Sequence, residues 1–169
     1  MIEHYNHTIQ LQNAPRLNNY VITEKLGESL QATVFKGFHK HVPDYALVIK
    51  CLKLLSSWED QSRHLRQKVE RLKVLHDPRI CTPLTLESSE DHQFIVQPWF
   101  GGLPLNTWAS GQAHIELADF LSLACALADT LQTVHDAGIT HGGVKPHNIL
   151  VLPDTLSVRL TDFITPLDI

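Results

Sequence analysis

Side chains able to bind phosphate or metal gather near the carboxyl end of this sequence, in the segment HGGVKPHNIL (residues 141–150) and the short sequence TDF that follows it. These stretches contain one ammonium group, Lys145, one amide, Asn148, and one carboxylate, Asp162. Taken locally, Asn148 is also typical of a capped turn and Asp162 of a charged strand end. Gly143 has no side chain that could accept a proton. The spacing of these residues must therefore decide whether they form a phosphate- or metal-binding site or an ordinary loop.

Written together, HGGVKPHNIL and TDF resemble the catalytic loop and metal-binding turn of the protein kinase family, whose patterns are H-R-D-L-K-P-x-N-I-L and D-F-G. The resemblance implies that Lys145 neutralises the γ-phosphate of ATP and that Asn148 and Asp162 bind Mg²⁺. It also implies a structural role for His141, which supports the loop by packing and hydrogen bonding. Where the family has the Asp that accepts the proton of the substrate hydroxyl, this chain has Gly143.

The chain departs from the family pattern at further positions. Gly142 stands in place of the Arg that, in many family members, receives an activation-loop phosphate. Ile164 replaces the Gly of D-F-G, and a β-branched residue tolerates positive φ badly. Loss of the base by itself removes a contribution of about 10²- to 10⁴-fold in rate. The sequence stops at Ile169, before the family's activation segment and later helices, so we expect no platform for a protein substrate.

The segment YVITEKLGESLQATVFKGFHK predicts two antiparallel strands around a turn at residues 27–32. The family's glycine-rich pattern G-x-G-x-x-G-x-V aligns here with Gly27, Ser29, Ala32 and Val34, so one glycine of three is present. Glycine serves in this loop because backbone amides must approach phosphate oxygens closely. Two Cβ atoms and the nearby carboxylate of Glu28 make that approach poorer.

The strand YALVIK ends in Lys50, which matches the family lysine that contacts the α and β phosphates, although a solvated strand end is the local alternative. A helix from residue 57 or 59 to residue 75 follows, with apolar residues at spacings of three and four. Lys68 occupies the place of the glutamate that pairs with the strand lysine in the family. Glu70 lies about 200° around the helix and is expected to face elsewhere.

Strands at residues 82–87 and 93–97 are predicted to complete a five-stranded antiparallel sheet. The sequence FIVQPWFGG after them resembles the hinge between the two kinase lobes. The resemblance implies that Val96 is the gatekeeper, and that the Gln97 carbonyl and the Trp99 amide face the edge of an adenine.

Two further helices are predicted at residues 105–110 and 115–137, and Gly138 is the expected terminator of the second. The apolar stripe of the long helix includes positions 117, 120, 121, 124, 127, 128, 131 and 134. In the intact family fold, later helices cover this stripe. We therefore expect a homo-oligomer or a protein partner to cover the helix 115–137, because exposed apolar patches commonly mark interfaces.

The composition limits the kinds of partner, cellular location and metal site that we expect for this chain. A chain of 169 residues with 43% apolar content can bury a core, and its net charge of −4 with mixed signs argues against nucleic acid as a partner. No run approaches ~18 uncharged apolar residues and the start lacks a signal peptide, so we expect no membrane association and a cytoplasmic location. Cys51, Cys81 and Cys125 are far apart, which predicts buried free thiols and no structural metal site.

The sequence thus predicts an α+β, protein-kinase-like fold that stops after the D-F-G-like turn. We expect a polar arm at residues 1–18, a small lobe at 19–97 with a five-stranded antiparallel sheet and one helix, and a hinge with a partial, mostly helical large lobe at 98–169.

The expected function is that of a pseudokinase, a regulatory or interaction module, with binding of ATP and Mg²⁺ left open. One alternative is a weak protein kinase or ATPase that uses Lys50, Lys145, Asn148 and Asp162 without the usual base. The other is a nucleotide-independent scaffold.

Overall fold

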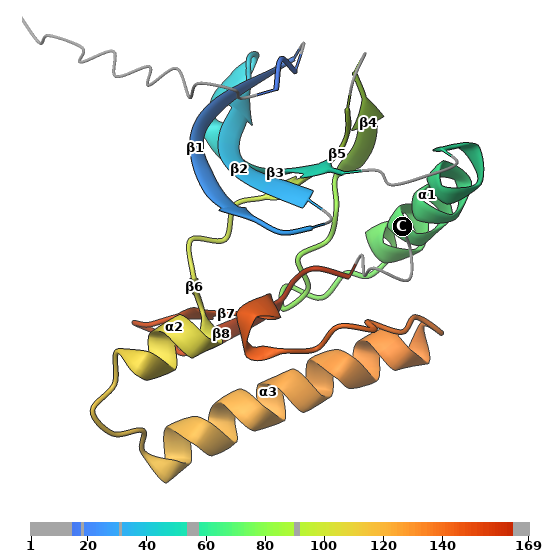
Figure 1. Ribbon diagram of the computed structural model, residues 1–169. Coiled ribbons are helices and arrows are strands. Elements are labelled where there is room, and N and C mark those ends of the chain that lie inside the picture. Colours follow the sequence, from blue (N-terminus) through green and yellow to red (C-terminus); the bar gives the residue numbers. More distant parts are fainter. Residues whose placement is uncertain (1–14, 18, 31, 54–57, 90–91, 164–169) are drawn as a thin grey trace, which may run out of the picture. The chain divides into compact units, whose positions relative to one another are not determined.

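The structure is a computed structural model (Figure 1). It divides into two compact units, each described separately: unit 1 is residues 1–54 with 84–99, and unit 2 is residues 55–83 with 100–169. The described residues are 15–17, 19–30, 32–53, 58–89 and 92–163.

Unit 1 contains a five-stranded antiparallel sheet, as the sequence predicted. Its strands lie in the order β1-β2-β3-β5-β4. The two strands placed around the turn at residues 27–32 are confirmed, whereas β4 begins three residues later than expected. The strands are β1 (Tyr20–Glu28), β2 (Ala32–His39), β3 (Val42–Leu52), β4 (Thr85–Ser88) and β5 (Gln93–Pro98) (Figure 1).

The core of unit 1 forms because the central strands place apolar side chains on one face at every second residue. One position on β2 must be glycine: a Cβ on Gly37 would lie 2.3 Å from the carbonyl oxygen of Val21 on β1. The buried residues of this core are Leu17, Phe35, Leu47, Ile49, Cys51, Phe94 and Val96.

Unit 2 contains the helices and a small sheet of order β6-β7-β8. Helix α1 begins within the predicted range and ends two residues before the predicted end, α2 has the predicted bounds, and α3 is slightly shorter than predicted. The sequence analysis did not identify the three short strands. The elements are α1 (Trp58–Lys73), β6 (Leu103–Pro104), α2 (Leu105–Ser110), α3 (Leu117–Asp136), the 3₁₀ helix η1 (Pro146–Asn148), β7 (Ile149–Leu152) and β8 (Ser157–Leu160) (Figure 1).

Helix α3 ends at the glycine that the sequence marked as its terminator. Gly138 has a φ of 65°, a left-handed conformation that glycine adopts without a steric cost. The amide of Ile139 then donates to the carbonyl of Val134 at 3.1 Å, which satisfies one of the last helical acceptors. Arg71 of α1 donates to the Gly138 carbonyl at 2.8 Å. The end of α3 is thus fixed by both backbone and side chain.

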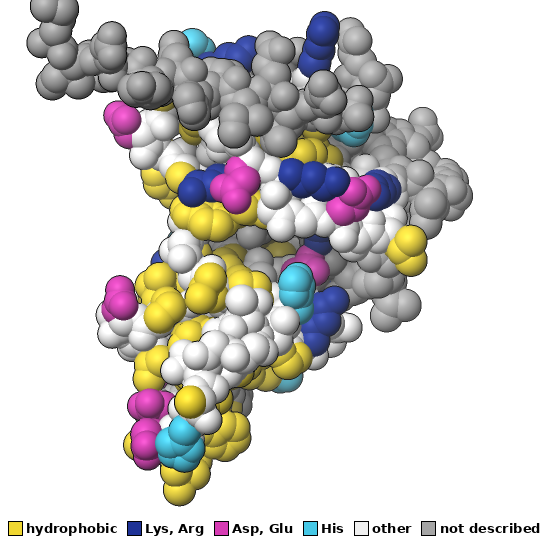
Figure 2. Space-filling model, turned by 60° about the vertical axis from the view of Figure 1, so that its left-hand side comes forward, with side chains coloured by type: hydrophobic (Ala, Val, Ile, Leu, Met, Phe, Trp, Pro, Cys, Tyr) yellow, Lys and Arg dark blue, Asp and Glu magenta, His cyan; other side chains and the backbone are white. Residues whose placement is uncertain are grey.

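One side of α3 packs into the core of unit 2, where Leu123, Thr130 and Val134 are buried. The other side is apolar and exposed. Leu117 is 70% exposed and Phe120 is 58% exposed. Figure 2 shows hydrophobic side chains gathered at the bottom of the view, where the first turns of α3 lie. The other exposed residues of this face are Leu121, Ala124, Cys125 and Ala128.

One expectation changes at this helix. Cys125 is exposed, so the prediction of three buried thiols is wrong for this residue, because its side of α3 has no cover. Cys51 and Cys81 are buried and free, as predicted. Among the described residues, α3 alone is long and apolar enough for a membrane span, despite Asp119 and Asp129. Helices of globular cores satisfy the same test, so this is weak support for a span.

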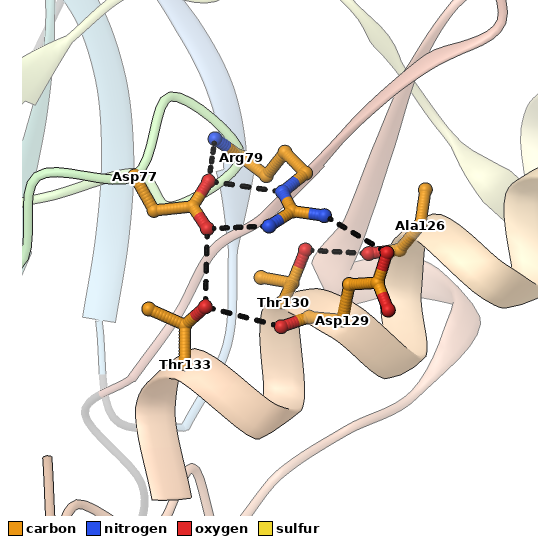
Figure 3. A network of polar contacts seen from close by, with 6 residues as sticks. All are labelled: Asp77, Arg79, Ala126, Asp129, Thr130 and Thr133. Carbon is orange, nitrogen blue, oxygen red and sulfur yellow. Dashed lines mark hydrogen bonds and ion pairs between the residues drawn. The ribbon is translucent and has the colours of Figure 1, made fainter. Parts of the chain in front are cut away.

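The segment after α1 is joined to α3 by charged groups (Figure 3). The Asp77 carboxylate accepts hydrogen bonds from the Arg79 guanidinium at 3.0 and 2.7 Å, and from the Thr133 hydroxyl at 3.3 Å. Arg79 also lies 3.5 Å from the carboxylate of Asp129. The guanidinium holds the pKa of Asp77 below its usual range. This network fixes the end of the α1 segment against α3 within unit 2.

Candidate functional site

His141 joins the two motif segments of unit 2, residues 141–150 and residues 161–163. Its side chain is 1% exposed. The amide of Gly143 donates to Nδ1 at 3.1 Å, so Nδ1 is an acceptor and the proton lies on Nε2, which donates to the Thr161 carbonyl at 2.8 Å. Burial lowers the pKa of His141, which favours this neutral form. The structural role expected for His141 therefore agrees with its contacts.

Asp162 adopts a strained backbone conformation. Its φ is 65°, and a residue with a Cβ enters the left-handed region only at a cost, typically about 1 kcal/mol or more. The residues on both sides of it are fixed: the Thr161 carbonyl is bound by His141, and the buried ring of Phe163 lies 4.5 Å from the His141 ring. Such strain persists where surrounding contacts determine it, and it is concentrated at functional sites.

Asn148 is 4% exposed, and its side chain is fixed within the loop. Its Nδ2 donates to the Gly143 carbonyl at 2.8 Å. Its backbone carbonyl accepts from the Thr161 amide at 2.9 Å, which places Asp162 next to the loop. The structure thus brings together Asn148 and Asp162, which the sequence assigned to one metal site. No group of three or more His, Cys, Asp or Glu suited to a metal ion occurs among the described residues.

Three other positions of this loop, Gly142, Gly143 and Lys145, were also singled out from the sequence. Gly142 has a φ of 77°, so the position where the family has an Arg is left-handed here and suits glycine. Gly143 contributes only its amide and carbonyl to the contacts described above, at the place of the missing base. The side chain of Lys145 is exposed. Ile164, the other departure noted from the sequence, lies outside the described residues.

The charged residues of α1 agree with the expected helix register. Glu70 is exposed and pairs with Lys73 at 2.6 Å, one turn along the same helix. Lys68 is half-buried, and its positive charge contributes to the lowered pKa of His141 after the larger effect of burial. Glu70 therefore faces away from the core, whereas the assignment of Lys68 to the place of the family's glutamate stays a prediction.

Four of the residues assigned to nucleotide binding, Val34, Lys50, Val96 and Gln97, lie on the adjacent strands β2, β3 and β5 of unit 1. Val34 on β2 is opposite Lys50 on β3, and Lys50 is opposite Ile95 on β5. Lys50 and Gln97 are half-buried, and Val96 is buried in the sheet. Opposite residues share a face of the sheet, so Lys50 lies on one face with Val34, whereas Val96 is opposite Ile49 and lies on the other face, in the core of unit 1. The roles of these residues toward a ligand stay predictions.

The Trp99 amide is placed differently from the expectation. Its N–H donates to the carbonyl of Ala46 on β3 at 3.0 Å. The cause is the register of the sheet, because Pro98 is opposite Leu47 and the ladder continues by one more hydrogen bond. An adenine facing this amide would have to displace a backbone bond. The Trp99 ring instead receives the Lys36 ammonium, 4.6 Å from its centroid.

The β1–β2 turn keeps one glycine of the family pattern, but its backbone does not require it. A Cβ on Gly27 would meet no atom within 4 Å, and Gly27 does not have a positive φ. Glu28, next to it, pairs with Lys25 and Lys53. Sequence reasoning missed both lysines. Lys25 lies three residues from Glu28 and could have been found, whereas Lys53 is 25 residues away and is brought close only by the sheet.

Comparison with known proteins places the chain in a family. The sequence profile of the protein kinase domain matches residues 20–165. The chain therefore belongs to the protein kinase domain family, in agreement with the five-stranded sheet of unit 1 and the loop of unit 2.

The sequence relatives are serine/threonine kinases. Serine/threonine-protein kinase ULK3 of Xenopus laevis is 29% identical over 150 residues, which are 88% of this chain and 32% of that protein. Serine/threonine-protein kinase cds1 of Schizosaccharomyces pombe is 31% identical over 111 residues, or 65% of this chain and 24% of that protein. The chain thus spans about a third or less of the length of these relatives.

Solved structures show the same fold. The kinase domain of PknI from Mycobacterium tuberculosis matches with a TM-score of 0.73 and 20% identity, over 90% of this chain and 62% of that domain. Rad53 in complex with AMP-PNP matches with a TM-score of 0.75 and 21% identity, over 86% of this chain and 38% of that one. At these identities the likeness supports the fold alone.

Proposed function

We propose that this chain is a pseudokinase domain, which has a protein-kinase fold, does not transfer phosphoryl groups and acts by binding. The observation that carries the proposal is Gly143 at the position of the catalytic base, in a loop that is otherwise assembled. His141, Asn148 and Asp162 keep a connected arrangement. The base is therefore absent from a loop that keeps its internal hydrogen bonds.

The metal end of the expected site fits Mg²⁺. With Nδ2 of Asn148 bound to the Gly143 carbonyl, its amide oxygen is the end of the side chain suited to a hard cation. Asp162 adds a carboxylate, and the exposed Lys145 adds a positive charge. If bound, Mg²⁺ would neutralise phosphate charge next to these residues.

The nucleotide-binding elements of unit 1 fit ATP less well. The Trp99 amide is used by Ala46 in the sheet. The amides of Ser29 and Ala32 in the β1–β2 turn are also used within the turn. These groups would meet adenine and phosphate in the pattern that the family resemblance implies. We therefore expect binding of ATP and Mg²⁺ to be weak, in keeping with a module whose task is not catalysis.

Phosphate release from ATP tests the proposal against a weak kinase or ATPase. We expect the wild-type chain to release no γ-phosphate above the rate in buffer, with or without Mg²⁺. The matched control is Asp162→Ala, which removes the metal carboxylate. Mg²⁺-dependent release by the wild type that this variant abolishes would contradict the proposal and favour the rival, in which Lys50, Lys145, Asn148 and Asp162 act without a base.

The exposed apolar face of α3 favours the interaction part of the function. Leu117, Phe120 and Leu121 are each at least half exposed on this helix. The expectation that a homo-oligomer or a protein partner covers the helix 115–137 stays a prediction. Two measurements test this prediction: sedimentation, which gives the oligomeric state, and binding of a hydrophobic dye, which reports an exposed apolar face. A monodisperse monomer that binds no dye would contradict it.

A further inference from the structure

The turn between β1 and β2 is closed by its own groups. The amide of Ser29 donates to the Ala32 carbonyl at 2.8 Å, and the amide of Ala32 donates to Ser29 Oγ at 3.1 Å. The Ser29 hydroxyl lies 3.3 Å from the same carbonyl. A backbone amide has a single hydrogen, so an amide with a good internal acceptor has little to offer a second one. Both amides are therefore occupied within the turn.

Glu28 ties the same turn to β3. Its carboxylate pairs with Lys25, at 2.5 Å, and with Lys53, which follows the end of β3. Lys53 also donates to the Ser29 carbonyl at 3.0 Å. The two ammonium groups lower the pKa of Glu28 to about 2, so the carboxylate is ionised at every physiological pH. One acidic side chain thus engages two lysines at the tip of the sheet.

A phosphate-binding turn needs the opposite arrangement. Its amides point at the ligand, its side chains are absent or small, and nearby cations face the phosphate oxygens. In this turn Ser29 Oγ competes for one amide, and Glu28 places a negative charge where phosphate would lie. Glu28 also pairs with both Lys25 and Lys53 and offsets one of their two positive charges. Each of these features opposes phosphate binding.

We propose that Glu28, Lys25, Lys53 and Ser29 form a latch that withholds the Ser29 and Ala32 amides and the two lysines from phosphate. The inference rests on the proposed function in treating the turn as the counterpart of a nucleotide-binding loop. It goes further by naming the residue that prevents phosphate recognition. Removal of a single carboxylate should therefore create a gain of binding.

The test uses backbone amide signals of the whole chain in solution, together with titrations of adenosine and of ATP with Mg²⁺. Glu28→Gln removes the acceptor charge and frees the two lysines. Ser29→Gly, added to it, removes the Oγ acceptor. The control is Glu24→Gln, which removes one exposed carboxylate from the same strand and leaves the latch intact. All four chains are measured at one low ionic strength, because salt screens exposed charges.

In the wild type, the Ser29 and Ala32 amides should exchange slowly with solvent and keep their signals when ATP is added. In Glu28→Gln, ATP affinity should rise about three- to tenfold, as expected from release of two exposed ion pairs, while adenosine affinity stays unchanged. The double variant should also lose protection of the Ala32 amide. Glu24→Gln should behave as the wild type does.

Two results would overturn the latch. One is fast exchange of the Ser29 and Ala32 amides in the wild type, and the other is a wild-type response of these amides to ATP as large as that of Glu28→Gln. If no chain binds ATP or adenosine, the nucleotide part of the proposed function fails. The exchange rates still decide on the latch, because slow exchange in the wild type that is lost in the double variant supports it without any ligand.

Discussion

The two units of this chain have departed from the kinase pattern in different ways. In unit 2 the loop around His141 keeps its internal hydrogen bonds and a strained Asp162, and glycine replaces two family side chains, at Gly142 and Gly143. In unit 1 the sheet is complete, but polar groups expected to meet a nucleotide are used inside the protein. The Trp99 amide is bound to Ala46, and the β1–β2 turn is bound to itself.

The difference concerns which part of the family's site is changed in each unit. Unit 2 has no side chain at Gly143, while the hydrogen bonds of its loop are formed. Unit 1 has the backbone shape of a nucleotide-binding sheet, yet its donors already have acceptors. Binding there must compete with existing hydrogen bonds, each worth about 1 kcal/mol net. These two changes are the basis of the proposal that the chain acts by binding and does not transfer phosphoryl groups.

The largest effect is expected where a glycine of unit 1 is needed for packing and not for ligand binding. Gly37→Ala places a Cβ against the Val21 carbonyl and should lower the free energy of unfolding by about 3 kcal/mol. Gly27→Ala is the matched control and should change it by less than about 0.5 kcal/mol, because the site is open. Denaturant unfolding measures both. Equal losses would show that the turn glycine is structurally required after all.

The second largest effect is expected from loss of the buried His141 side chain in unit 2. His141→Ala removes two hydrogen bonds and a buried ring, and should lower the free energy of unfolding by about 2 to 3 kcal/mol. The amide signal of Asp162 should change as well, because its strained backbone loses the contact at Thr161. His114→Ala, at an exposed site, is the control. An unchanged Asp162 signal would mean that His141 does not hold the turn.

The charged network in Figure 3 should contribute less, because Arg79 is partly exposed. Asp77→Asn keeps the shape of the side chain but removes the charge that binds the guanidinium. We expect a loss of about 1 kcal/mol in the free energy of unfolding. Glu70→Gln removes an exposed pair on α1 and serves as the control, with little expected change. A larger loss for Glu70→Gln would place the important ion pair on α1 instead.

The pH dependence should separate these two contributions. The pKa of His141 is lowered by burial, so its contribution is present above the unfolded value near pH 6.5 and is lost as the pH falls below it. The pKa of Asp77 is lowered by Arg79, so its contribution is lost only below about pH 4. Thermal unfolding between pH 3 and 8 measures both. His141→Ala should weaken the first decline and Asp77→Asn the second, and unchanged curves would contradict the assignment.

Much of the fold could be predicted because it depends on local periodicity and on recognisable turns. The strands around residues 27–32 and the helix that precedes Gly138 follow from apolar spacing and terminators, whereas the five-stranded sheet was expected from the resemblance to the kinase family. Strands β6, β7 and β8 could not be predicted in this way. They have two to four residues each, too few for a pattern, and tertiary contacts define them.

The candidate site was predictable to a different extent in each unit. In unit 2, Asn148 and Asp162 belong to a dense sequence motif, and the structure brings them together as expected. In unit 1, the bond from Trp99 to Ala46 depends on the register between β3 and β5, which the sequence did not indicate. The pairing of Glu28 with Lys53 depends on a sheet that joins distant residues. Hydrogen bonds that compete with a ligand are therefore the part that sequence reasoning could not supply.

The most direct test of the difference between the units is thermal unfolding with ATP and Mg²⁺ on three chains: the wild type, Glu28→Gln and Asp162→Ala. Binding to the folded state raises the midpoint, and tighter binding at the same ligand concentration raises it further. We predict a small shift for the wild type, a larger one for Glu28→Gln, and a shift for Asp162→Ala that no longer depends on Mg²⁺. A large shift for the wild type that Glu28→Gln does not increase would contradict the account.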